Sequence, residues 1–183
     1  SDKYLPKQPP YDSFFKEGKH AMKVVFITGQ DYGEGKYDFF RLYNHIISKW
    51  PGKYHWKKDK AMPEHDSSGS RQASYTKSVK TDDGRAVNIS VEIREAKDKQ
   101  RLKEIFYQAF SSEDVDYILV GAHSSDIQAI IDNAFKDTAK GKLRSGGKQI
   151  IHFEGCNSSF YAADKTAKAS NNGSQFIGTL NLS

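Results

Sequence analysis

The sequence has a single cysteine, Cys156, among 183 residues. One cysteine excludes an intrachain disulfide framework and a cysteine-rich metal site. No apolar run approaches the roughly 18 residues of a membrane-spanning helix, so we expect no membrane span. Aromatic residues make up 13% of the chain, which argues against a disordered protein. A chain of this length predicts one domain that buries its own core.

The sequence has only a small excess of positive charge. It contains 28 Lys and Arg against 23 Asp and Glu, which gives a net charge of +5. The basic stretch 56–60 is short, contains an acid and accompanies no nucleic-acid motif, so we do not expect a nucleic-acid partner. The chain begins with Ser1 rather than Met, which fits a processed protein. We expect a soluble protein. Secretion or export to a periplasm after signal removal stays open, as do its compartment and oligomeric state.

Strand and helix patterns alternate along most of the chain. Apolar runs predict strands, amphipathic periods predict helices, and the turn at 81–85 predicts a β-hairpin. Residues 1–21 show no steady period and predict an irregular arm, so the domain spans 22–183. The alternation predicts an α/β three-layer sandwich with a largely parallel sheet and helices on both faces. Expected strands are 22–28, 75–80, 86–94, 115–123, 149–156 and 175–180. Helices are expected to begin near Asp38, Asp98, Asp126 and Asn157, with Asp38 and Asp126 as caps. Residues 53–70 are expected to form a loop.

Two residues with catalytic potential end two of the predicted core strands. His123 ends the strand at 115–123, and Cys156 ends the strand at 149–156. The carboxyl ends of parallel strands form the sites of such sheets, so neighbouring strands would bring imidazole and thiol together. An imidazole can take the thiol proton, stabilise the thiolate and later protonate a leaving amine. The alternative interpretation is an inert buried thiol and a loop histidine.

The same two strand ends carry a resemblance to a known family. Residues 117–124 read Tyr-Ile-Leu-Val-Gly-Ala-His-Ser, and residues 150–158 read Ile-Ile-His-Phe-Glu-Gly-Cys-Asn-Ser. They resemble the His and Cys strand ends of caspase-like (clan CD) cysteine peptidases, nearest in motif to legumain, gingipain and CHAT-type domains. The last strand, at 173–180, is similar to the strand after the cysteine in gingipains and CHAT domains.

The resemblance implies a cysteine endopeptidase that needs no cofactor and no metal and acts on a peptide or protein substrate. Cys156 would be the nucleophile and His123 the general acid/base. The backbone N–H groups of Cys156 and Ser124 would hold the oxyanion, although Ser124 replaces the usual glycine. Asp31 and Glu34, in the loop after the first strand, could line a pocket for a substrate Lys or Arg.

A second hypothesis stays open: a catalytically inactive caspase-like or flavodoxin-like α/β domain that serves as a binding or regulatory module. Other patterns are less specific. The loop at 31–36 lacks the order of a phosphate-binding motif. The polar residues His55, Glu64, His65 and Asp66 match no metal-site spacing and predict a solvated loop.

Overall fold

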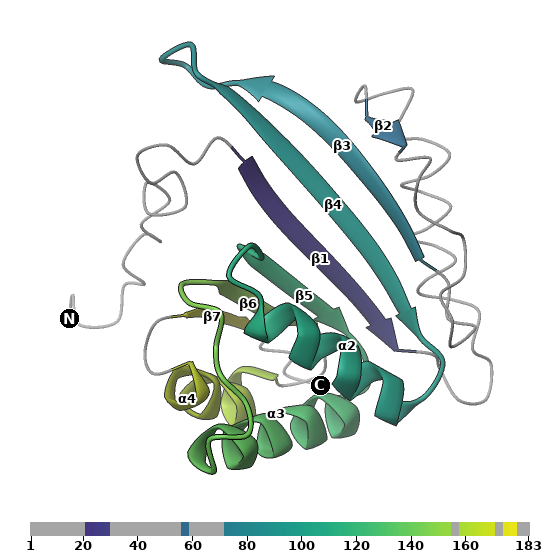
Figure 1. Ribbon diagram of the computed structural model, residues 1–183. Helices are drawn as coiled ribbons and strands as arrows, with labels where there is room; N and C mark the ends of the chain where they lie inside the picture. Colours follow the sequence, from purple (N-terminus) through teal and green to yellow (C-terminus); the bar gives the residue numbers. More distant parts are fainter. Residues whose placement is uncertain (1–20, 30–55, 59–71, 155–157, 171–173, 179–183) are drawn as a thin grey trace.

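The computed structural model describes residues 21–29, 56–58, 72–154, 158–170 and 174–178. They form an α/β fold in which helices pack on a single sheet (Figure 1). In chain order the described elements are β1 (Ala21–Gly29), β2 (Lys57–Lys58), β3 (Gln72–Lys80), β4 (Ala86–Ala96), α2 (Lys99–Ser111), β5 (Tyr117–Gly121), α3 (Ser124–Ala139), β6 (Ile150–Glu154), α4 (Ser158–Ala169) and β7 (Gln175–Gly178).

The sheet has seven strands in the order β2-β3-β4-β1-β5-β6-β7. The five strands from β4 to β7 in this order run parallel, whereas β2 and β3 pair antiparallel with their neighbours. The predicted α/β class with a largely parallel sheet is therefore confirmed. The predicted hairpin joins β3 to β4, and its turn closes with Gly84 at φ +82°, a conformation that favours glycine.

The described helices α2, α3 and α4 all cover one face of the sheet (Figure 1). The chain moves from β4 to β5, β6 and β7 in one direction across the sheet, and right-handed crossovers then leave every helix on the same side. Helices were predicted on both faces, and the helix expected after Asp38 lies outside the described residues. Among the described helices, none is long and apolar enough to cross a membrane.

The core lies mainly between the sheet and these helices. Side chains that point toward the helices alternate along each strand with side chains that point away. The fully buried core on the helix side includes Ile27, Phe106, Ile118, Ile151 and Phe153. A second cluster on the opposite face joins β1, β3 and β4 through Val24, Ala73, Tyr75, Val91 and Ile93. Apolar side chains on both faces explain why β1 reads as a nearly continuous apolar run.

Three details differ from the sequence prediction. Strand β5 ends at Gly121, so His123 does not end the strand as expected but follows it by two residues, because helix α3 begins directly after His123. Lys57 and Lys58, expected in a loop, form the edge strand β2 beside β3. Two lysines carry no strand pattern, so only the pairing with β3 identifies them. Helix α3 begins at Ser124 with His123 as its N-cap, three residues before the cap that we predicted at Asp126. The side chain of Asp126 is buried rather than used as a cap.

Helix α2 is fixed at both ends by side chains. The helix begins next to Asp98, as predicted, and the Asp98 carboxylate forms its N-cap by accepting a hydrogen bond of 2.7 Å from the backbone N–H of Arg101. At its end, the buried amide of Gln149 donates to the carbonyl oxygens of Ala109 at 3.0 Å and Ser112 at 3.1 Å. Gln149 directly precedes β6, so this amide joins the end of α2 to the start of a core strand.

We expect Gln149→Met to lower the free energy of unfolding by about 2 kcal/mol, because carbonyl oxygens at the end of α2 lose a buried donor. Chemical denaturation measures this loss. The matched control is Gln128→Met on the exposed surface of α3, which should change stability by no more than about 0.5 kcal/mol. Equal effects of the two substitutions would contradict the capping role.

Helices α2 and α3 are also joined by a tyrosine–carboxylate hydrogen bond. The Tyr107 hydroxyl donates to Asp137 Oδ2 at 2.7 Å. This bond holds the pKa of Asp137 below its usual range, and the charges of Lys103, Lys142 and Lys140 add to the effect. Burial and the same carboxylate raise the pKa of Tyr107 far above its usual range.

The Tyr107–Asp137 bond predicts a stability difference that depends on pH. A carboxyl group whose pKa is lowered by folding stabilises the fold above its unfolded pKa, and this contribution disappears as pH falls through the folded pKa. Tyr107→Phe should therefore be less stable than wild type near neutral pH, and this difference in stability should become smaller in acid. Thermal unfolding of both proteins between pH 3 and 7 measures the difference. In an Asp137→Asn background, Tyr107→Phe should show no such dependence; if it does, another group is responsible.

Candidate functional site

The carboxyl ends of β1, β5 and β6 form the candidate site, which we call the carboxyl edge. These strands are adjacent and parallel, and their last residues are Gly29, Gly121 and Glu154. Gly121 pairs with Glu154 in the register, and the N–H of Ala122 donates to the Glu154 carbonyl at 3.4 Å. The two strands therefore end level with each other. In the strand order, the next described strands after β1 lie on one side of the β1–β5 pair, and the strand after β5 lies on the other side. The strand order therefore reverses between β1 and β5, and α/β proteins bind ligands at such a point.

His123 lies two residues beyond the end of β5, in an exposed position at the carboxyl edge. It is the N-cap residue of α3, and its carbonyl accepts hydrogen bonds from Asp126 N at 2.9 Å and Ile127 N at 3.0 Å. Its side chain makes no capping hydrogen bond. The backbone of His123 is thus held by the helix, while its imidazole is not engaged as a cap.

Ser124 is the first residue of α3. The first N–H groups of an α-helix have no carbonyl acceptor within the helix and carry its positive dipole end. The backbone N–H of Ser124 therefore has the character of an oxyanion donor, directly after His123 in the chain.

Three of the predicted site residues cannot be described in the same way. Cys156, Asp31 and Glu34 lie outside the described residues, and so do the polar residues around His65. In the sequence, Cys156 follows the last residue of β6 by two positions, as His123 follows the last residue of β5 by two positions.

His152, a second histidine near the candidate site, has a hydrogen-bond partner on the neighbouring strand. It lies on β6 on the face opposite Phe153, and its Nδ1 is 2.7 Å from the Tyr117 hydroxyl on β5. The side chain is half-buried. Because Tyr117 is the first residue of β5, this bond engages His152 with the end of β5 that lies away from the carboxyl edge.

A row of four residues at the carboxyl edge was not predicted from the sequence. The register places Glu95, Thr28, Gly121 and Glu154 side by side across β4, β1, β5 and β6. Alternation puts all four on the face opposite the helices. A periodic apolar pattern interrupted by Thr28 and Glu95 was the available signal, but only the strand order aligns the four.

Glu95 and Thr28 in this row are buried, whereas Glu154 is exposed. Glu95 and Thr28 are 2% and 3% exposed, and among the described residues Thr28 Oγ1 has no hydrogen-bond partner. No atom of the described residues lies within 4 Å of a Cβ added at Gly121, which stands between Thr28 and Glu154. A hydroxyl and carboxylates in one row offer hydrogen-bond acceptors to a donor-bearing group of a ligand.

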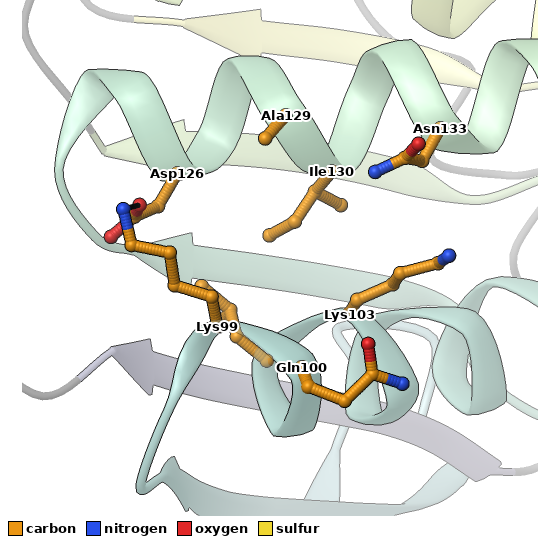
Figure 2. A pocket seen from close by; sticks show the side chains of 8 residues that line it. Lys99, Gln100, Lys103, Asp126, Ala129, Ile130 and Asn133 are labelled. Atoms are coloured by element: carbon orange, nitrogen blue, oxygen red, sulfur yellow. Dashed lines mark ion pairs between the residues drawn. The ribbon is translucent and has the colours of Figure 1, made fainter.

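A separate groove lies between α2 and α3 (Figure 2). Its volume is about 170 Å³, which is below the range of about 300–1,000 Å³ usual for ligand pockets. The Lys99–Asp126 ion pair stands at one end of it. Because it is small, we interpret it as a seam between two helices rather than a substrate site. It is lined by Lys99, Gln100, Leu102, Lys103, Asp126, Ala129, Ile130 and Asn133.

The described part of the chain contains no cluster of three or more His, Cys, Asp or Glu residues that could hold a metal ion. Comparison with protein-family models and with curated proteins finds no match to this chain. The resemblance to caspase-like peptidases therefore rests on the motifs at the strand ends and on the last strand.

Proposed function

We propose that this chain is a cysteine peptidase of caspase-like type, with Cys156 as the nucleophile and His123 as the general acid/base. The observation that carries the proposal is the level register of β5 and β6, which pairs Gly121 with Glu154. Each candidate residue follows its strand by two positions. An exposed His123 at the start of α3 adds support, because a general base must reach substrate at the surface.

In the proposed reaction, the His123 imidazole takes the proton of the Cys156 thiol. The thiolate attacks the carbonyl carbon of the scissile peptide bond, and the carbonyl oxygen becomes an oxyanion. The backbone N–H groups of Ser124 and Cys156 donate to it. Protonation of the amine by the imidazolium then releases the first product and leaves a thioester. Water, deprotonated by His123, hydrolyses the thioester and regenerates the thiol.

The row at the carboxyl edge supports a substrate preference. Glu154 lies two residues before the proposed nucleophile and is exposed, and no atom of the described residues lies within 4 Å of a Cβ added at its neighbour Gly121. An exposed carboxylate beside the proposed dyad favours a cationic side chain through a charge-assisted hydrogen bond. Asp31 and Glu34, in the loop after β1, would add negative charge if they line the same pocket. We therefore propose Lys or Arg before the scissile bond.

The first test of the dyad is covalent labelling by peptide acyloxymethyl ketones ending in Asn, Asp, Lys or Arg, followed by intact mass. We expect one adduct, on Cys156, and His123→Ala should lower its rate of formation by about 100-fold or more, because the thiol loses its base. His152→Gln is the matched control: it changes a histidine on the adjacent strand and should label like wild type.

The labelling experiment also decides between the two hypotheses for this chain. No adduct from any of the four ketones, while iodoacetamide still alkylates the denatured protein, would contradict the proposed dyad. That outcome supports the inactive binding or regulatory module.

The substrate preference has its own test. The Lys and Arg ketones should label faster than the Asn and Asp ketones, and Glu154→Gln should reduce that preference by about tenfold, the effect of one lost charge-assisted bond. Glu113→Gln removes an exposed glutamate before β5, at the opposite edge of the sheet, and should leave the preference unchanged. The ratio of second-order labelling rates is the measurement. A ratio unaffected by Glu154→Gln would rule out this carboxylate as the specificity determinant.

A further inference from the structure

Asp126 is a buried carboxylate that the proposed reaction does not use. It lies in the first turn of α3 with 4% of its side chain exposed. Burying a charge is costly unless it is paired. Its partner is Lys99, the first residue of α2, whose Nζ lies 2.7 Å from Asp126 Oδ1 (Figure 2). The ion pair therefore joins the starts of two helices.

The same residue holds the backbone of His123. The N–H of Asp126 donates to the His123 carbonyl at 2.9 Å, within the first turn of α3. On the other side of His123, Ala122 packs against β1 so closely that a Cβ added at Gly29 would lie 3.2 Å from the Ala122 Cβ. His123 is thus held between a strand contact that precedes it and the Asp126 backbone that follows it.

We propose that the Lys99–Asp126 ion pair positions His123. By tying the first turn of α3 to the start of α2, the pair fixes where the imidazole stands over the carboxyl edge. Lys99 and Asp126 are positioning residues: they touch neither substrate nor the reacting atoms. The proposal rests on the proposed function, because it assigns the ion pair a role in the reaction of Cys156.

The test compares variants of the full chain by the rate at which the Arg-terminated acyloxymethyl ketone labels Cys156. Lys99→Met and Asp126→Asn each break the pair. Both should lower the rate by about tenfold, since displacements of about 1 Å cost up to 100-fold in rate. Lys99→Arg keeps a cation at this position and should retain most of the rate.

Asp132→Asn provides the matched control. Asp132 lies further along α3 and pairs with Lys165 on α4, so its loss also breaks an ion pair between helices. It should leave the labelling rate at the wild-type level. A rate loss in Asp132→Asn equal to that in Asp126→Asn would show that general loosening of α3 is the cause and would overturn the proposal.

The pH profile separates positioning from a direct effect of charge. Asp126→Asn removes a negative charge near His123, whereas Lys99→Met leaves that charge without its cation. A purely electrostatic effect would move the pH dependence of labelling in opposite directions in the two variants. Positioning lowers the rate in both. Opposite shifts without a shared loss of rate would overturn the proposal.

An NMR measurement keeps this inference distinct from the peptidase proposal. The His123 Cε1–H resonance should move in Lys99→Met and Asp126→Asn but not in Asp132→Asn. Suppose that labelling of the wild type depends on His123, but Lys99→Met and Asp126→Asn change neither the labelling rate nor the His123 resonance. That result would overturn the positioning role and leave the proposed peptidase function intact. If wild type is not labelled at all, the proposed function fails and the catalytic role of the pair fails with it, even where the resonance moves.

Discussion

The parallel ladder between β1, β5 and β6 is the constraint on which the rest of the structure depends. Backbone hydrogen bonds in a parallel pair fix the register, and here they set Thr28 beside Gly121 and Gly121 beside Glu154. A slip of one residue would reverse the faces of a strand and expose side chains such as Ile118 and Val120. The buried core therefore keeps the ends of β1, β5 and β6 level, and this alignment positions the residues of the candidate site.

Much of this arrangement could be predicted from the sequence. Runs such as residues 115–121 have the apolar and β-branched composition of central strands, and Asp98 marks the start of a helix whose cap it forms. Local patterns of this kind determine element type. The positions of His123 and Ser124 were predicted only approximately: the sequence placed His123 at the end of the strand and the helix start near Asp126, whereas β5 ends at Gly121 and α3 begins at Ser124.

The remaining features depend on contacts between distant segments, which local patterns do not contain. β2 exists only because β3 offers it a partner. Glu95 and Thr28 lie beside each other because β4 and β1 are neighbours, although residues 30–85 separate these strands in the sequence. Asp126 resembled a helix cap because an acid near a helix start usually is one. Its burial against α2, 27 positions after Lys99, is a property of helix packing.

The Lys99–Asp126 pair also contributes to the electrostatics of two helix starts. A lysine at the first position of a helix is unfavourable because the helix dipole is positive there. The N-cap carboxylate of Asp98 offsets this at the start of α2, and Asp126 adds a second carboxylate from α3, where it also complements the dipole of its own helix. One buried carboxylate thus serves two helix starts. Both helices begin at the carboxyl edge, so the charges of Lys99 and Asp126 lie close to His123 in the fold. A change in their geometry would therefore affect the residue on which the proposed chemistry depends.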